Sequence, residues 1–192
     1  MSLTLITGPA RSGKSEWAEH LAQQASLLNG QPNGRQVVYV ATAQTNLDDA
    51  EWQARIDQHK FRRPAQWQCE EVPIALAAAV ARYDTAHCLL IDSLGTWLAN
   101  LIEQDAEEWD ATQQALIAAL AHTTADVILV AEETGWGVVP AYELGRTFRD
   151  RLGTLSRNIG AIATNVYLVT SGYAINLSTL GQPVGKIVSS KD

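Results

Sequence analysis

Short apolar runs alternate with longer amphipathic segments along this chain. Each run is bounded by polar or turn-forming residues, which is typical of buried strands. The runs cover residues 3–6, 36–41, 87–92, 126–131 and 166–172, and residues 67–72 are a candidate for one more short strand. Strands that alternate with helices predict an α/β fold with a mostly parallel sheet and right-handed crossovers.

The segments between these runs carry apolar side chains at helical spacing. In the first of them, Trp17, Leu21, Ala25 and Leu28 recur every three or four residues, as on the buried face of an amphipathic helix. The pattern predicts helices over residues 15–28, 46–59, 73–83, 94–102, 109–121 and 142–162. Residues 135–140 are expected to form a loop, and the tail from Asn176 is weakly patterned.

Composition limits the kinds of protein to consider. The chain has 192 residues, of which 46% are hydrophobic, so we expect one globular domain over residues 1–192. Its net charge of −7 argues against a nucleic-acid or membrane-surface binder, because both need a basic face. Cys69 and Cys88 form no C-x-x-C pair, and neither an export signal nor an apolar run long enough for a membrane span is visible. We therefore expect a cytoplasmic protein.

The residues between the first strand and the first helix read G-x-x-x-x-G-K-S. This is the pattern of a phosphate-binding loop, in which backbone N–H groups surround the phosphates, the lysine contacts the outer phosphates and the hydroxyl can bind Mg²⁺. A glycine-containing turn with a chance lysine is the alternative, but the order of strand, loop and helix favours a P-loop NTPase-like three-layer fold. The loop residues are Gly8, Pro9, Ala10, Arg11, Ser12, Gly13, Lys14 and Ser15.

Carboxylates end two of the predicted strands. Asp92 stands where a phosphate-loop protein places its second Mg²⁺ ligand, although it could instead cap the helix that follows. Glu132 and Glu133 follow the 126–131 strand and are candidates for a general base or a metal ligand, or for a solvated turn. The sequence leaves these alternatives open.

His59 differs from the other histidines in its neighbours. It ends a predicted helix, where a histidine is often only a partner of the helix dipole, but Lys60, Arg62 and Arg63 follow it within four residues. These cations could bind an anion or form a solvated basic turn. A neutral imidazole beside bound phosphates could act as a nucleophile, whereas His20, His87 and His122 lack such surroundings.

Four blocks of the sequence match, in order, those of one enzyme family. Residues 7–15 are similar to T-G-G-A-R-S-G-K-S, residues 39–44 to Y-I-A-T-[SA]-Q, residues 55–64 to R-I-x-x-H-[KR]-x-x-R-P, and residues 133–140 to E-V-G-x-G-[IV]-V-P. The chain thus resembles the bifunctional adenosylcobinamide kinase/adenosylcobinamide-phosphate guanylyltransferases of cobalamin biosynthesis. The phosphate loop alone is unspecific, whereas the histidine block and the last block are specific to that family.

The resemblance implies roles for individual residues. His59 falls on the histidine that becomes covalently guanylylated, and Ser15 and Asp92 are the expected Mg²⁺ ligands. Pro9 replaces the usual second glycine and removes one N–H, and Glu132 stands where asparagine is common. Ser156-Arg157 likewise replaces the common Asn-Gln. Besides the phosphate loop with Lys14, the implied GTP contacts are Thr42, Ala43, Gln44, Lys60, Phe61, Arg62, Arg63, Glu71 and Asp92.

The resemblance also implies the activity. The enzyme would phosphorylate adenosylcobinamide with ATP or GTP, and would then transfer GMP from GTP to adenosylcobinamide phosphate through a guanylyl-histidine. Family members assemble as trimers, so a homo-oligomer is expected. A small-molecule kinase without guanylyl transfer, a GTP-binding switch and a structural nucleotide-binding subunit are the alternatives; a switch would carry an N/T-K-x-D element, and none occurs here.

Overall fold

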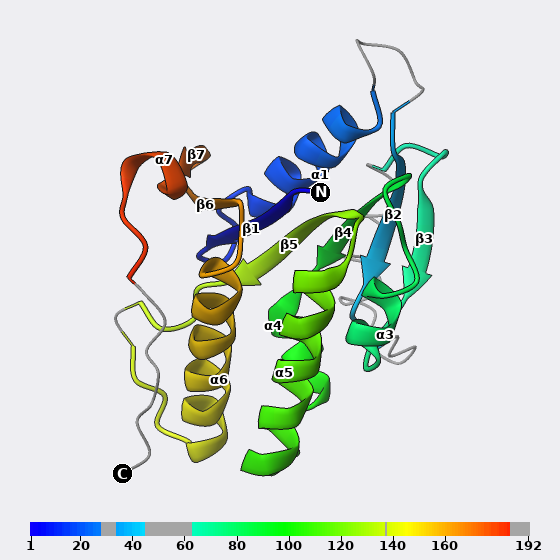
Figure 1. Ribbon diagram of the computed structural model, residues 1–192. Helices are drawn as coiled ribbons and strands as arrows, with labels where there is room; N and C mark the ends of the chain where they lie inside the picture. Colours follow the sequence, from blue (N-terminus) through cyan, green and yellow to red (C-terminus); the bar gives the residue numbers. More distant parts are fainter. Residues whose placement is uncertain (28–33, 45–62, 137, 185–192) are drawn as a thin grey trace.

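The computed structural model describes residues 1–27, 34–44, 63–136 and 138–184. They contain a seven-stranded sheet in the order β3-β2-β4-β5-β1-β6-β7 (Figure 1). All pairs of neighbouring strands are parallel except β6 and β7. The predicted α/β fold with a mostly parallel sheet is therefore confirmed. The strands are β1 (Leu3–Gly8), β2 (Gln36–Ala41), β3 (Gln68–Glu71), β4 (His87–Asp92), β5 (Asp126–Glu132), β6 (Asn165–Thr170) and β7 (Tyr173–Asn176).

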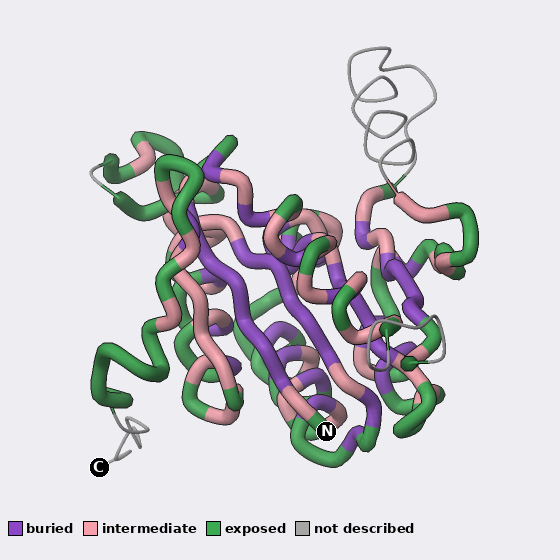
Figure 2. The backbone as a smooth tube through the Cα atoms, turned by 90° about the horizontal axis from the view of Figure 1, so that it is seen from above, coloured by how far each residue is buried: buried purple, intermediate pink, exposed green. Residues whose placement is uncertain are grey.

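Helices cover both faces of this sheet, as Figure 1 shows. On one face α1 packs Ala18 and Ala22 against the strands, and on the other face four helices enclose a larger core that contains Trp97 and Leu116. The tube in Figure 2 is accordingly buried along the central strands and exposed at its margins. The helices are α1 (Lys14–Ala25), α3 (Leu76–Val80), α4 (Leu94–Asn100), α5 (Ala106–His122), α6 (Glu143–Gly160) and α7 (Leu177–Leu180).

Two helix starts differ from the sequence prediction. The helix predicted from residue 109 begins at Ala106, because Asp105 accepts hydrogen bonds from the backbone N–H groups of Glu107 and Glu108. The side chain of Glu108 accepts a hydrogen bond from the N–H of Asp105 and so completes a capping box, and these acidic residues form the first turn of α5. The helix predicted from residue 73 is the shorter α3, which begins at Leu76.

The remaining differences lie at the C-terminal end and in the second helix. Strand β7 and helix α7 were not predicted. Strand β7 pairs with β6 through a tight turn at Ser171 and Gly172, both with positive φ. The predicted helix over residues 46–59 lies outside the described residues. Among the described residues, no helix combines the length and the apolar character needed to cross a membrane.

Candidate active site

The carboxyl ends of the parallel strands meet at one edge of the sheet, and the predicted site residues gather there. Gly8 at the end of β1 lies opposite Glu132 at the end of β5. Ala41 at the end of β2 lies opposite both Asp92 of β4 and Glu71 of β3. In open α/β sheets this edge is where ligands bind. The register therefore brings together the phosphate loop and the acidic residues.

The phosphate loop joins β1 to α1 in the geometry that the motif predicts. Gly13 is the N-cap of α1 with φ of 94°, and no side chain caps the helix. The N–H groups of its first turn are thus free of side-chain caps and can receive an anion. Lys14 is only 8% exposed, and its Nζ donates to the carbonyl oxygen of Pro9 at 3.1 Å.

Two further details show how tightly this loop is built. A Cβ on Gly8 would stand 2.1 Å from the carbonyl oxygen of Val169 in β6, so glycine is required there by the neighbouring strand. The hydroxyl oxygen of Ser12 is buried and has no hydrogen-bond partner among the described residues. A buried unpaired hydroxyl is costly, and a phosphate oxygen would satisfy it.

Asp92 is not a helix cap. Ser93 caps α4 instead, since its Oγ accepts from the N–H of Thr96 at 3.3 Å. The Asp92 carboxylate accepts a hydrogen bond from the hydroxyl of Tyr39 through Oδ2 at 3.0 Å, and its Oδ1 bonds to no other described residue. One oxygen of this carboxylate is therefore bonded to Tyr39, and the other can bind a ligand at this edge of the sheet.

Glu132 bridges β5 to the start of α4. Its two carboxylate oxygens accept hydrogen bonds from the Ser93 hydroxyl and from the N–H of Gly95, the latter at 2.9 Å. Removal from water raises the pKa of this carboxyl, and the Asp92 charge raises it further, while the Ser93 bond and the Lys14 charge oppose the shift. Both carboxylate oxygens of Glu132 are thus bonded to residues at the start of α4.

Thr42 and Glu133 form hydrogen bonds that connect the ends of the strands at this edge. The Thr42 side chain is fully buried, donates to the carbonyl oxygen of Ser93 at 2.8 Å and accepts from the N–H of Ser93 at 2.9 Å. Glu133 accepts a bond from the Thr7 hydroxyl at 2.6 Å, and its N–H donates to the Gly8 carbonyl. These contacts fix the strand ends around the phosphate loop.

Strands β2 and β3 place three further predicted residues, Ala43, Gln44 and Glu71, at or just beyond this edge. Arg63 places its guanidinium carbon 3.2 Å from the centroid of the Tyr39 ring, while Glu71 ends β3 with an exposed side chain. Ala43 is half-buried and Gln44 exposed just beyond β2. His59, Lys60, Phe61 and Arg62 lie outside the described residues, so the structure leaves their placement untested.

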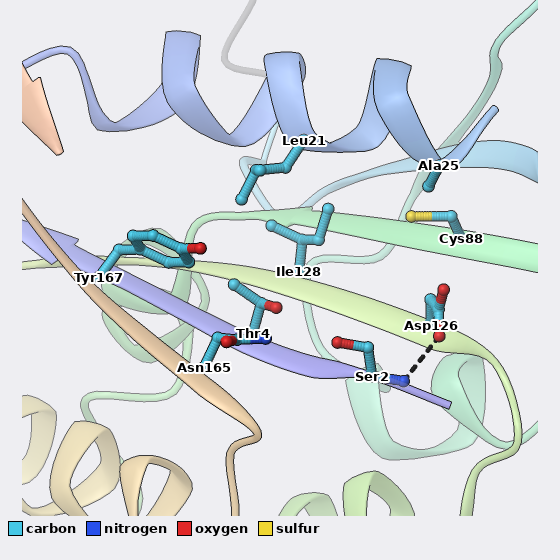
Figure 3. Close-up of a pocket in the computed structure, with 9 residues that line it drawn as sticks. All are labelled: Ser2, Thr4, Leu21, Ala25, Cys88, Asp126, Ile128, Asn165 and Tyr167. Carbon is cyan, nitrogen blue, oxygen red and sulfur yellow. Dashed lines mark hydrogen bonds between the residues drawn. The ribbon is translucent and has the colours of Figure 1, made fainter. Parts of the chain in front are cut away.

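A hollow of about 180 Å³ lies away from this site, at the opposite end of the strands (Figure 3). Its only drawn hydrogen bond runs from the N–H of Ser2 to Asp126 at 2.6 Å. No phosphate-loop residue borders it, so it is separate from the candidate active site. It is lined by Ser2, Thr4, Leu21, Ala25, Cys88, Asp126, Ile128, Asn165 and Tyr167.

The described residues hold no cluster of three or more His, Cys, Asp or Glu side chains that could bind a metal by itself. Mg²⁺ usually needs no such cluster, since it binds through one or two protein oxygens together with substrate phosphates and water. The Ser15 hydroxyl of the phosphate loop and the Asp92 carboxylate, which ends β4 at the same edge of the sheet, are oxygen donors of the kind that Mg²⁺ needs. Sequence reasoning missed Ser93 and Gly95, whose roles depend on a contact with Glu132 across strands.

Residues 4–177 match the family described as cobinamide kinase / cobinamide phosphate guanyltransferase. This chain belongs to that family. The bifunctional adenosylcobalamin biosynthesis protein CobP of Pseudomonas aeruginosa is 40% identical over 94% of this chain and 98% of its own. The protein CobU of Salmonella typhimurium is 37% identical over 91% of this chain and 99% of its own. The resemblance drawn from the sequence blocks is thus confirmed.

Among solved structures, a KaiC-like protein of Pyrococcus horikoshii covers 87% of this chain and 70% of its own. The two are 17% identical with a TM-score of 0.44, which is too distant to add to the fold described above. The description of the sheet therefore rests on the structure of this chain alone. The family membership rests on the family match and on the two relatives named above.

Proposed function

We propose that this protein carries out both reactions of its family. It phosphorylates adenosylcobinamide with ATP or GTP, and it then transfers GMP from GTP to adenosylcobinamide phosphate to give adenosylcobinamide-GDP. The observation that carries the proposal is the buried Lys14 in a phosphate loop, at the edge of the sheet where the strand of Asp92 also ends, in a chain whose residues 4–177 match the family. Both reactions use one domain, residues 1–192.

In the kinase reaction the hydroxyl oxygen of the corinoid arm attacks the γ-phosphorus, and the nucleoside diphosphate leaves. Such a transfer depends on positioning and on neutralising charge, with little covalent chemistry for the protein to do. Lys14 and the free N–H groups at the start of α1 hold the phosphates. Glu133 has one oxygen without a hydrogen bond to the described residues, so it is the better of the two glutamates to accept the hydroxyl proton.

Ser15 and Asp92 are the residues that would hold Mg²⁺. The ion, when bound, neutralises charge on the phosphate oxygens. Asp92 suits this role because Ser93 has taken over the cap of α4 and leaves one carboxylate oxygen without a described partner.

In the transferase reaction the His59 imidazole attacks the α-phosphorus of GTP and pyrophosphate leaves. The phosphate of the corinoid then displaces the histidine, so one hard transfer becomes two easier ones. Lys60, Arg62 and Arg63 neutralise the charge of the phosphates. The remaining nucleotide contacts are proposed for Thr42, Ala43, Gln44, Phe61 and Glu71. The buried side chain of Thr42 would act by holding Ser93 in place.

The alternatives differ in what they produce from nucleotide. A kinase alone would transfer phosphate without forming a GMP–protein adduct, a switch would hydrolyse GTP slowly without an acceptor, and a structural subunit would bind nucleotide without transfer. The family match of residues 4–177 favours the two transfers over all three.

The test is a product assay with wild type and Lys14→Ala. Adenosylcobinamide, GTP and Mg²⁺ should yield both the phosphorylated and the GDP-linked corinoid, identified by mass. Because Lys14 serves phosphates common to both steps, Lys14→Ala should lower both rates by about 100- to 1,000-fold, a loss of about 3–4 kcal/mol of transition-state stabilisation. Equal turnover of the folded variant and wild type would overturn the assignment of the phosphate loop.

A further inference from the structure

Tyr39 contacts both charged sides of the site, although nothing in the phosphate-loop pattern assigns it a role. It lies on β2 and is 4% exposed. Its hydroxyl donates to Oδ2 of Asp92 at 3.0 Å, and its ring lies under the Arg63 guanidinium, with 3.2 Å between the guanidinium carbon and the ring centroid. One rigid side chain therefore joins an anion to a cation.

Both contacts are of kinds that orient charged groups. A hydroxyl that donates to a carboxylate fixes the rotation of that carboxylate and occupies one of its oxygens, so the other points elsewhere. A guanidinium over an aromatic face is held by the ring quadrupole, and the attraction strengthens when water is excluded. Burial and the nearby Asp92 charge raise the pKa of Tyr39, so the hydroxyl keeps the proton that it donates.

We propose that Tyr39 is a positioning residue for both reactions: its hydroxyl orients Asp92 and its ring orients Arg63. The inference rests on the proposed function, in which Asp92 serves the metal and Arg63 the phosphates. It goes further than that function because it makes both the metal ligand Asp92 and the phosphate contact Arg63 depend on one side chain. Loss of the hydroxyl alone and loss of the whole ring should therefore have different effects.

Tyr39→Phe and Tyr39→Leu separate the two contacts. Phenylalanine keeps the ring under Arg63 and removes the bond to Asp92, whereas leucine removes both. Tyr83→Phe is the matched control, because Tyr83 also donates to a carboxylate, Oε2 of Glu70 at 2.8 Å, and Glu70 lies on β3, which three strands separate from β1 and its phosphate loop. Urea denaturation of each variant checks that it is folded.

The first measurement needs no catalysis. Mn²⁺ binding in the presence of a non-hydrolysable GTP analogue, followed by electron paramagnetic resonance, reports on Asp92. Tyr39→Phe should weaken it by about tenfold, the effect of one hydrogen bond to a charged group, while Tyr83→Phe matches wild type. Equal Mn²⁺ binding by wild type and Tyr39→Phe would overturn the proposed role of the hydroxyl.

The second measurement reports on Arg63. At saturating Mg²⁺, the rate of GMP labelling of Tyr39→Phe should stay within about threefold of wild type, and that of Tyr39→Leu should fall by about tenfold more. Equal labelling of the two variants would overturn the role of the ring. If Tyr39→Leu does not fold, the role of the ring is tested by comparing binding of the GTP analogue to Tyr39→Phe and Tyr39→His. The histidine ring attracts a guanidinium less strongly than the phenylalanine ring, so Tyr39→His should bind the analogue more weakly. A wild type without any transfer would refute the proposed function, yet the Mn²⁺ comparison would still decide the role of the hydroxyl.

Discussion

At the residue scale, residues that look interchangeable in the sequence have different roles in the structure. Asp92 was a candidate cap of α4 from the sequence, and the next residue, Ser93, is the cap in the structure. Glycines differ in the same way: Gly13 adopts a left-handed conformation at the start of α1, while Gly8 is required because the Val169 carbonyl leaves no room for a Cβ. Residue type narrows the options, and the neighbours in space decide among them.

Glu132 offers a prediction on pH and stability. Its pKa is raised in the folded protein, so the fold binds this proton more tightly than the unfolded chain does. The stability that the protonated carboxyl contributes is present at low pH and is lost as the pH rises through the raised pKa. The free energy of unfolding of wild type should therefore fall relative to that of Glu132→Gln as the pH increases.

Urea denaturation of both proteins from about pH 4 to about pH 8 measures this difference. All other titrating groups are common to the two proteins, so most of their contribution cancels. A difference in unfolding free energy that stays constant with pH, or that changes in the opposite direction, would contradict the described environment of Glu132.

At the element scale, two glycines in helices should respond to alanine with opposite signs. A Cβ at Gly153 in α6 meets nothing within 4 Å, so Gly153→Ala should stabilise the protein by about 0.5–1 kcal/mol through helix propensity. A Cβ at Gly95 in α4 would stand 2.1 Å from Oε2 of Glu132. Gly95→Ala should therefore destabilise by about 1–3 kcal/mol, because the carboxylate must move away from its partners.

Urea denaturation at neutral pH compares the two variants with wild type. Gly153→Ala serves as the control for the change in residue type, since both substitutions add the same methyl group to a helix. A stabilising effect of alanine at both positions would show that Glu132 does not hold the start of α4 as described.

The elements themselves were largely predictable where periodicity is strong. Strands β1, β2, β4, β5 and β6 follow from short apolar runs, and helices α1, α4, α5 and α6 follow from spacings of three and four residues. The start of α5 was missed because the capping role of Asp105 outweighs the polar appearance of its first turn. Strand β7 was missed because a four-residue edge strand with alternating exposure carries too little pattern.

At the scale of the whole molecule, the order of the strands could not be predicted. Local periodicity does not say which strands pair, and β1 lies between β5 and β6, both distant in sequence. The motifs nevertheless predicted that the phosphate loop and Asp92 would share one edge, because parallel strands end on the same side. The contacts of Tyr39, Ser93 and Glu132 could not be predicted, since each depends on the strand order.

The outer edge of the sheet leads to a prediction on assembly. Within the part of the chain that the structure describes, strand β7 is the last strand of the sheet, and Tyr173 and Leu180 beside this edge are each 76% exposed. An open edge strand with exposed apolar residues favours pairing with another chain, and the family resemblance implies a trimer. We therefore propose that copies of this chain associate through β7 and α7.

Sedimentation velocity tests this assembly. Leu180→Glu should lower the sedimentation coefficient toward that of a monomer, because a charge would be buried in the interface. Ile74→Glu is the control, since Ile74 is 54% exposed near α3 and belongs to another part of the surface. A wild type that sediments as a monomer, or an unaltered Leu180→Glu oligomer, would contradict the proposed interface.

The central claim is that one chain carries two chemistries and that His59 serves only one of them. Kinase activity depends on the phosphate loop and charge, whereas guanylyl transfer needs a nucleophile at the α-phosphorus. His59→Ala should therefore lose guanylyl transfer and retain at least part of the kinase activity. The adduct in wild type should be a phosphoramidate, labile in acid and stable in alkali.

Incubation with α-labelled GTP, followed by mapping of the labelled peptide, tests the claim most directly. We expect the label on His59 in wild type and none in His59→Ala, while the variant still phosphorylates adenosylcobinamide. Equal labelling of both proteins, or label on Lys60, would contradict the assignment of the nucleophile. Parallel loss of kinase activity in a folded His59→Ala protein would contradict the division of labour between the two reactions.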